Sequence, residues 1–437
     1  MEFRALLLVA LAACGGSAAP ATAHRDAPRP TPAPRPERPV DQAAADGVAA
    51  AVRAHEALVS TSVVPADSAR VGEAALDALA AALAVAAPDV AWSGDAERDR
   101  ALLGEAAGDL ARRATRPAPS DLPLVVARAM AAAAGDPHVF ALDNTGMAGL
   151  LAATSGLPHV QLGFAAHRSG DVWVVSEVFA GSAADKAGLA PGTEFAATGF
   201  DWGRDFIRHI GAREGEVIEL PGGLALELAR VSMPIVEHRV LPGRVGVLRV
   251  HAFTGTADAA RDAGALVASA LEDLDRKKVT RLVIDLRENM GGNPVPVVSI
   301  LAAGDPVVWM ARPGEDPQPM SRDRAFAKRK RHIAIVVNEQ TYSAAEMAAL
   351  ALRELGGARV FGQPTAGALT VPTPAELPTG VLLFYPGALA LGPRSLKSPD
   401  GRRVAPDETI PNTSGADVRA GRDAQLDAAV AWVMKQR

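Results

Sequence analysis

The sequence predicts a multi-domain α/β protein, because three stretches of the chain carry three different apolar patterns. Residues 42–150 are rich in Ala and place apolar side chains at helical spacing, which predicts a helical N-terminal domain. Short runs of strand-forming residues across 158–237 predict a smaller, β-rich domain. In 238–437, continuous apolar strands alternate with helical segments, which predicts an α/β core with a mostly parallel sheet.

Four helices account for the spacing in the first of these stretches. Their apolar positions are Val48, Val52, Leu58 and Val59; Ala75, Leu76, Leu79, Ala82 and Leu83; Leu102, Leu103 and Leu110; and Leu124, Val125 and Met130. Asp67 or Ser68 before the second helix and Pro88 after it are start and stop signals. No residue of 41–134 suggests chemistry, so we interpret this part as a structural domain or a lid.

The composition excludes several classes of function. The chain has 437 residues, of which 49% are hydrophobic and 22% are charged, and its net charge is −5. A nucleic-acid binder carries a basic footprint, which is missing here, and two Tyr offer few platforms for stacked bases. The single Cys excludes an intramolecular disulfide and a Cys cluster. Metal-binding His spacings and the phosphate-loop spacing do not occur, so we expect no metal, nucleotide or other cofactor.

The first residues are typical of an export signal. An apolar run ends in Leu11-Ala12-Ala13-Cys14, which resembles a bacterial lipobox. Residues 1–14 are therefore expected to be a lipoprotein signal in which Cys14 carries the lipid anchor, and 15–41 a Pro-rich linker in extended conformation. This predicts a cell-envelope lipoprotein on the periplasmic side of a bacterial membrane. The alternative is a plain secretory signal with a coincidental Cys.

The β-rich stretch contains a recognisable string of residues. The segment from Val178 to Thr193, Val-Phe-Ala-Gly-Ser-Ala-Ala-Asp-Lys-Ala-Gly-Leu-Ala-Pro-Gly-Thr, resembles the PDZ signature. The resemblance implies that the backbone near Leu162, Gly163 and Phe164 binds a peptide C-terminus by strand addition. The alternative is a PDZ fold that is kept as a spacer or regulator.

In the predicted α/β core, two strands lead into polar or glycine-rich turns. The strand 281–287 runs into Gly291-Gly292, and the strand 332–338 is followed by Ser343 at the start of a helix. Active sites of parallel sheets lie at the carboxyl ends of the strands. Ser343 is then a candidate nucleophile, and the N–H groups of Ala344 and of Gly291 or Gly292 are candidate oxyanion donors. The alternative for Ser343 is a helix N-cap.

Four motifs in this core resemble those of the S41 peptidases, the C-terminal processing or tail-specific type. They are Asp285-Leu286-Arg287-Glu288-Asn289-Met290-Gly291-Gly292; 338–346 around Ser343; Gly362-Gln363-Pro364-Thr365-Ala366-Gly367; and Val404-Ala405-Pro406-Asp407. They occur in the family's order, and the resemblance covers about residues 135–437. It implies a serine endopeptidase that acts through an acyl-enzyme on Ser343.

The residue expected to act as general base differs from that of the better-known half of the family. Where Ser-Lys members carry the Lys, this chain has Ala368, which cannot accept a proton. The sequence is closer to the tricorn-like Ser-His branch, which implies His138 as base and Asp400 as its orienting carboxylate. His138 also fits a structural role, Asp400 fits a tight turn with Gly401, and His251 is a further candidate base.

Two functions are open at this point. The first is an envelope-anchored serine endopeptidase with protein or peptide substrates, no cofactor and no nucleic-acid partner. The second is an inactive scaffold whose PDZ-like domain binds peptide C-termini. Ala368 favours the scaffold, as does Glu288, which replaces a Gly of the family motif beside the expected oxyanion hole. Ser343, Gly291-Gly292 and His138 favour the enzyme.

Overall fold

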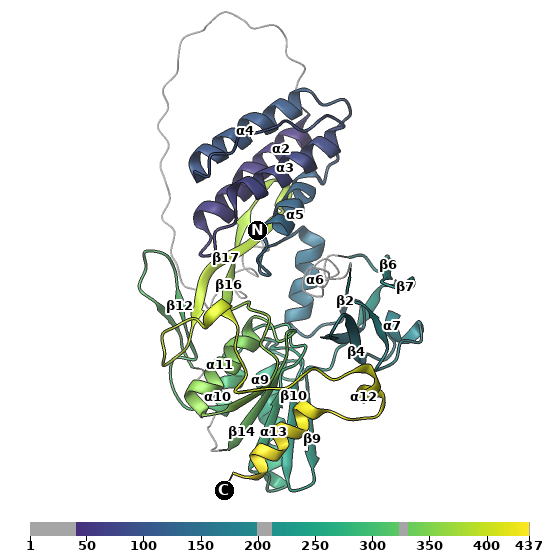
Figure 1. The fold of residues 1–437 in the computed structure, drawn as a ribbon, viewed down its shortest axis with the longest axis vertical. Helices are drawn as coiled ribbons and strands as arrows, with labels where there is room; N and C mark the ends of the chain where they lie inside the picture. Colours follow the sequence, from purple (N-terminus) through teal and green to yellow (C-terminus); the bar gives the residue numbers. More distant parts are fainter. Residues whose placement is uncertain (1–40, 199–211, 323–330, 437) are drawn as a thin grey trace, which may run out of the picture. The chain divides into compact units, whose positions relative to one another are not determined.

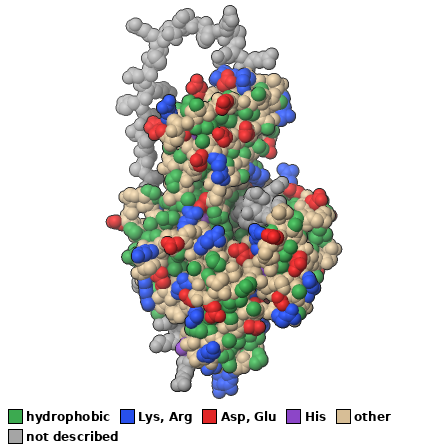
Figure 2. Space-filling model, in the orientation of Figure 1, with side chains coloured by type: hydrophobic (Ala, Val, Ile, Leu, Met, Phe, Trp, Pro, Cys, Tyr) green, Lys and Arg blue, Asp and Glu red, His purple; other side chains and the backbone are tan. Residues whose placement is uncertain are grey.

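The computed structural model describes residues 41–198, 212–322 and 331–436. Asp41–Arg437 forms one compact unit. Cys14 and the Pro-rich stretch lie outside the described residues, so the lipid anchor stays a prediction. Across the described ranges, no helix combines the length and the apolar character that crossing a membrane requires. On the face drawn in Figure 2, Lys and Arg side chains are interspersed with Asp and Glu.

Four helices open the described chain, as the apolar spacing predicts. They are α2 (Gln42–His55), α3 (Ser68–Leu83), α4 (Ala96–Arg112) and α5 (Leu122–Ala134); a π-helical turn, η1 (Glu56–Thr61), extends α2, and α6 (Asn144–Thr154) comes later. Asp67 is the N-cap of α3, because its carboxylate accepts a hydrogen bond from the Arg70 N–H at 2.8 Å.

A six-stranded sheet forms the centre of the C-terminal half (Figure 1). In spatial order its strands are β18 (Glu408–Thr409), β15 (Arg359–Gly362), β14 (His332–Val337), β11 (Arg281–Asp285), β10 (Val245–Val250) and β9 (Val236–Leu241). Neighbouring strands run parallel, except that β9 runs antiparallel to β10. The predicted α/β core with a mostly parallel sheet is confirmed.

Helices cover both faces of this sheet because its strands are apolar on both sides. The helices are α9 (Ala263–Arg276), α10 (Val295–Leu301), α11 (Ala344–Gly356) and α13 (Ala424–Met434). Ile284 and Ile335 share a core with the first three helices, whereas Val283 and Val336 pack against α13. Because helices cover both faces, an active site in this core is expected at the strand ends and in the loops that follow them.

A second sheet joins the N-terminal helices to the C-terminal half. It contains β1 (Phe140–Leu142), β17 (Leu382–Leu391), β12 (Val308–Ala311) and β13 (Gln318–Met320), with β16 (Thr370–Glu376) on β17 and a short turn, η2 (Pro378–Gly380), between β16 and β17. Leu377, Val381, Leu383 and Tyr385 of this hairpin share one apolar core with α2, α3, α4 and α5. The helices therefore complete their core with residues that the sequence pattern assigns to the C-terminal part.

The β-rich region (residues 159–231) consists of small antiparallel sheets. Its elements are β2 (His159–Gln161), β3 (Phe164–Ser169), β4 (Val172–Val178), α7 (Ala183–Lys186), β5 (Glu194–Ala196), β6 (Val217–Leu220), β7 (Leu224–Glu227) and β8 (Ala229–Val231). Phe164, Trp173 and Leu226 are buried in its core. The helix α12 (Gly415–Arg419) touches this region, since the Gly415 N–H donates to Glu194 Oε1 at 3.0 Å.

Candidate active site

Ser343 lies on a tight turn between β14 and α11. The Thr341 hydroxyl holds this turn by donating to the Leu286 carbonyl at 2.9 Å and accepting the Asn338 N–H at 3.0 Å. Ser343 itself has φ 53° and ψ −118°, a left-handed conformation that favours glycine, and α11 begins at the next residue. Such strain costs about 1–3 kcal/mol and persists where the surroundings fix it, which is common at active sites.

Glu346, in the first turn of α11, fixes the backbone around Ser343. Its buried carboxylate accepts the Ser343 N–H at 2.9 Å and the Ala368 N–H at 2.8 Å on Oε2. On Oε1 it accepts the Thr365 hydroxyl at 2.6 Å and the Gly367 N–H at 2.8 Å. Burial raises the pKa of Glu346 to about 7, although these four donors act in the opposite direction. Glu346 was not among the predicted site residues; its place three residues after Ser343, the spacing of a capping box, was the available signal.

The glycine turn after β11 lies against the nucleophile. Gly291 has φ 106°, and a Cβ there would lie 3.0 Å from Ser343 Cβ and 3.2 Å from the Ala344 nitrogen. Gly292 has φ 122°, and its Cβ would collide with the Phe253 carbonyl. The Gly291 N–H already donates to Asn289 Oδ1 at 2.8 Å. Of the predicted oxyanion donors, the N–H groups of Gly292 and Ala344 therefore remain.

His138 is buried beside the residue that precedes the nucleophile. Its ring meets the Tyr342 ring edge-on, with centroids 5.0 Å apart, and the Tyr342 hydroxyl donates to the Pro137 carbonyl. Its Nδ1 lies 2.6 Å from Thr370 Oγ1. Burial, reinforced by the charge of Arg402, lowers the pKa of His138 to about 3, so the ring is neutral near pH 7. Among the described residues, no hydrogen bond joins this ring to Ser343.

The structure does not bring Asp400 to His138. Asp400 is exposed at the short turn η3 (Asp400–Arg402), and Thr370 occupies the Nδ1 side of the ring where a carboxylate was expected. The turn contributes a different side chain: Arg402 Nη2 lies 2.9 Å from Asp136 Oδ2. The surface position of Asp400 agrees with its alternative reading as a turn residue. Thr370, two residues after Ala368, was not among the predicted site residues.

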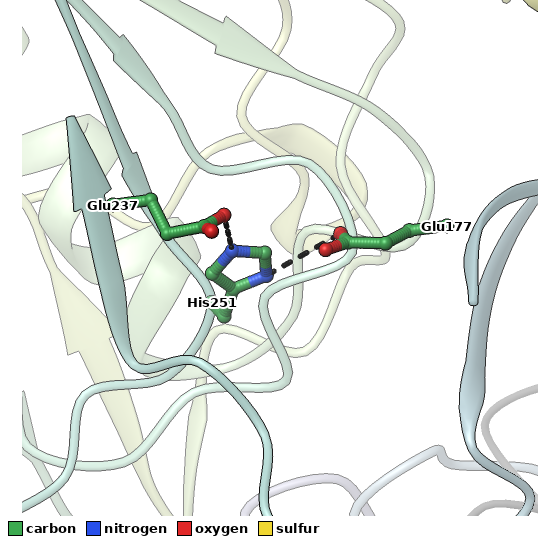
Figure 3. Close-up of side chains that lie close together, drawn as sticks. All are labelled: Glu177, Glu237 and His251. Carbon is green, nitrogen blue, oxygen red and sulfur yellow. Dashed lines mark hydrogen bonds and ion pairs between the residues drawn. The ribbon is translucent and has the colours of Figure 1, made fainter. Parts of the chain in front are cut away.

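His251, the other candidate base, faces two carboxylates (Figure 3). Its Nε2 lies 2.9 Å from Glu237 Oε2, and its Nδ1 lies 3.8 Å from Glu177 Oε2. The three side chains are close enough to share a cation. However, the carboxylates lie on opposite edges of the ring, and Arg249 Nη2 already lies 3.2 Å from Glu177. We therefore interpret the cluster as an ion-pair network between β4 and the core sheet.

Glu288, which replaces a Gly of the motif, is held by three side chains. Its Oε2 accepts from Arg249 at 3.0 Å, its Oε1 accepts from Asn338 at 2.8 Å, and His167 Nδ1 lies 3.4 Å from Oε1. Burial alone would raise the pKa of Glu288, but the His167 hydrogen bond and the Arg249 charge outweigh it and lower the pKa to about 2. Within the described ranges, no hydrogen bond links this carboxylate to Ser343 or Ala344.

His167 connects the β-rich region to this cluster, and its protonation is expected to control the link. Its Nε2 donates to the Thr413 carbonyl at 2.7 Å, so an attractive contact with Glu288 requires a second proton on Nδ1. Burial lowers the pKa of His167, but Glu288 outweighs it and the net shift is upward from 6.5. The stabilisation is then complete below about pH 6.5 and lost as the pH rises through the higher pKa of the folded protein.

Chemical denaturation of wild type and His167→Gln between about pH 5.5 and pH 9 measures this effect. We expect the stability difference between them to shrink as the pH rises. The partly exposed pair of His238 and Asp273, with Nε2 2.9 Å from Oδ2, supplies the control His238→Gln, for which only a small loss of stability is expected. A difference for His167→Gln that stays constant with pH would contradict the assignment.

The residues Leu162, Gly163 and Phe164 lie at the start of β3. Leu162 and Phe164 are buried, and the Gly163 carbonyl accepts the Phe179 N–H at 2.9 Å and the Ser182 hydroxyl at 3.0 Å. In the described part of the region, β3 is the edge strand of its sheet, next to β4. The backbone farther along β3, at Arg168, is bonded to Glu339 and Asn412.

Comparison with known proteins places the core in a family. Residues 244–410 match the model of "Peptidase family S41". A "Probable CtpA-like serine protease" of Staphylococcus aureus (strain bovine RF122 / ET3-1) is 24% identical over 271 residues, which cover 57% of this chain and 52% of that protein. "Carboxyl-terminal-processing peptidase 3, chloroplastic" of Arabidopsis thaliana is 30% identical over 190 residues, which cover 42% of this chain and 35% of that protein. The chain spans about half the length of the Staphylococcus relative, and less of the Arabidopsis one.

A solved structure shares the fold over most of the described chain. It is titled "Structure of mature CPAF complexed with lactacystin", with a TM-score of 0.51, 12% identity, and coverage of 91% of this chain and 100% of that chain. At this identity the likeness concerns the fold alone. Residues 244–410, which contain all four ordered motifs, are thus similar to peptidase family S41.

Proposed function

We propose that this chain is a serine endopeptidase that hydrolyses peptide bonds through an acyl-enzyme on Ser343. The observation that carries the proposal is the strained turn that presents Ser343 at the N-terminus of α11, against Gly291 and Gly292. A hydroxyl at that position lies near the positive end of the helix dipole and beside free backbone N–H groups. His138 is the proposed base.

In the proposed reaction, His138 Nε2 takes the proton of Ser343 Oγ as the oxygen attacks the peptide carbonyl. The N–H groups of Ala344 and Gly292 stabilise the oxyanion that forms. His138 then donates the proton to the leaving amine, and water attacks the acyl-enzyme by the reverse route. Among the described residues no hydrogen bond joins His138 to Ser343, so the proposed reaction needs this contact to form in the substrate complex.

The proposed substrates are proteins or peptides of the cell envelope, where the Cys14 anchor would hold the enzyme. The names of two relatives, a CtpA-like serine protease and a carboxyl-terminal-processing peptidase, support protein or peptide substrates. For the β-rich region we propose a PDZ-like role, in which the edge of β3 near Phe164 receives a peptide C-terminus as an added strand.

The second candidate is an inactive scaffold that binds peptides through the β-rich region. Two observations favour it: Ala368 stands at the family's Lys position, and no carboxylate contacts the His138 ring in the described structure. A scaffold does not need a nucleophilic Ser343, so reactivity at this residue separates the two candidates.

Labelling of the full-length chain with a fluorophosphonate probe tests the proposal. We expect labelling that disappears in Ser343→Ala and falls at least tenfold, on the order of the general-base contribution, in His138→Ala. Asp400→Ala is the control from the same site prediction and should label like wild type, since Asp400 is exposed and away from the ring. Wild-type labelling no higher than that of Ser343→Ala would favour the scaffold.

A further inference from the structure

The His138 ring is held from several sides, and one of its partners is a hydroxyl. The backbone N–H of His138 donates to Asp136 Oδ1 at 2.9 Å, and the edge contact with Tyr342 sets the tilt of the ring. The polar contact recorded for the ring itself is the 2.6 Å approach of Nδ1 to Thr370 Oγ1. Both side chains are buried, Thr370 completely. Whether this hydroxyl accepts a proton from Nδ1 or donates one to it therefore goes with the tautomer of the ring.

Thr370 is well suited to hold a ring in one orientation. It is the first residue of β16 and pairs with Leu389 of β17, and the adjacent Leu369 carbonyl accepts the Ala390 N–H at 3.1 Å. Its branched side chain has few accessible rotamers, so the hydroxyl is fixed by the strand. A site built on a strand is more precise than one on a loop.

A base for Ser343 must have Nε2 free of a proton, so the proton of the neutral ring must lie on Nδ1. We propose that Thr370 is the positioning residue of this site: its Oγ1 accepts the Nδ1 proton of His138 and thereby keeps Nε2 available to take the Ser343 proton. This inference rests on the proposed function. It gives to a neutral hydroxyl the role that we expected for Asp400.

The charges around the ring are compatible with a neutral partner. Arg402 and Asp136 form an ion pair beside His138, and the Tyr342 ring contributes no charge. A hydroxyl orients the ring without adding a negative charge to stabilise the imidazolium. The low pKa of His138 is consistent with this environment, since burial and Arg402 both oppose protonation.

Two substitutions at Thr370 separate the hydroxyl from the shape of the side chain. Thr370→Val keeps the volume and removes the hydrogen bond, whereas Thr370→Ser keeps the hydroxyl. Thr373→Val, on the same strand and half-buried, is the matched control. We expect Thr370→Val to lower the fluorophosphonate labelling rate of Ser343 about tenfold or more, as for a lost buried hydrogen bond, while Thr370→Ser and Thr373→Val stay within about threefold of wild type. Labelling of Thr370→Val at the wild-type rate would overturn the proposal.

A second readout does not depend on reactivity. NMR of the full-length chain with ¹⁵N-labelled histidine distinguishes a proton on Nδ1 from one on Nε2. The signals that disappear in His138→Gln are those of His138. We expect the Nδ1–H tautomer in wild type and Thr370→Ser, and its loss or mixing in Thr370→Val. An Nε2–H tautomer in wild type would refute the proposal. If wild type does not label at all, the proposed function fails while the NMR result still decides the role of Thr370.

Discussion

Glu346→Gln is expected to destabilise the protein by about 3 kcal/mol and to lower labelling of Ser343 at least tenfold. Each carboxylate oxygen of Glu346 accepts two donors, from Ser343 and Ala368 on one side and from Thr365 and Gly367 on the other. Whichever way a Gln amide is turned, its NH₂ group faces two donors that lose their acceptor. The turn that presents Ser343 then loosens. Chemical denaturation and the labelling rate measure the two effects.

The matched control is Glu354→Gln, on the same helix. Glu354 also accepts three hydrogen bonds, from Ser395 and Arg394, but it is only partly buried and water can replace them. We expect a loss below about 1 kcal/mol and unchanged labelling. Equal losses for the two variants would show that Glu346 has no special part in the site.

Protonation of Glu346 should imitate the effect of the substitution on labelling but not on stability, because a pKa raised above the unfolded value means that acid favours the folded state. Because its pKa is about 7, acid below that pH turns one carboxylate oxygen into a donor and removes an acceptor near Ser343. His138, with a pKa of about 3, stays neutral in the same range. The labelling rate of wild type is therefore expected to fall as the pH drops through about 7, and that of Glu346→Gln to stay flat there.

Arg249→Met is expected to cost about 3–5 kcal/mol of stability. Its guanidinium lies 3.0 Å from Glu288, 3.2 Å from Glu177 and 3.9 Å from Asp285, and the Glu288 and Asp285 side chains are almost fully buried. Removing the cation leaves the buried Glu288 carboxylate without its Arg partner, whereas Asp285 keeps Arg287 at 2.7 Å. Leaving a buried charge unpaired is far more costly than losing a surface pair. Urea denaturation measures the loss.

Two further variants sharpen this test. Arg359→Met removes an Arg of strand β15 in the same sheet, whose exposed side chain lies 3.6 Å from Glu408, and should cost at most about 1 kcal/mol. Adding Glu288→Gly to Arg249→Met removes the carboxylate that lost its Arg partner. It also replaces a residue with a strained φ of 56° by glycine. The double variant should thus be more stable than Arg249→Met alone. If it is less stable, the burial of Glu288 is not what makes the loss of Arg249 costly.

The sequence was informative where local patterns decide the structure. The α/β core and the turns at Gly291-Gly292 and Ser343 follow from apolar strands that end in residues of special backbone conformation. The partner of His138 could not be predicted in this way. Thr370 lies 232 residues away along the chain. It follows Ala368, the family's Lys position, by two residues, but that motif gives a Thr no part in orienting a His. Only the pairing of β16 with β17 and the packing beside them bring it to the ring.

The same limit applies to Glu288. The sequence flagged it as a carboxylate beside the expected oxyanion hole, because a Gly is usual there. The negative charge of Glu288 is balanced by Arg249 from the next strand and by His167 from the β-rich region, and these contacts come from tertiary packing. A substitution that looks harmful in a motif is thus accommodated by residues that no motif includes.

The core shared by the N-terminal helices and the β16–β17 hairpin bears on the order in which the protein assembles. The helices α2 to α5 leave the ribosome long before Leu383 and Tyr385, which complete their apolar core. An N-terminal domain with a closed core can fold during synthesis, but this one still exposes apolar surface until the hairpin arrives. The last folding step of these helices therefore requires nearly the whole chain. The hairpin that carries Thr370 and the helices α2 to α5 reach their final structure in the same step.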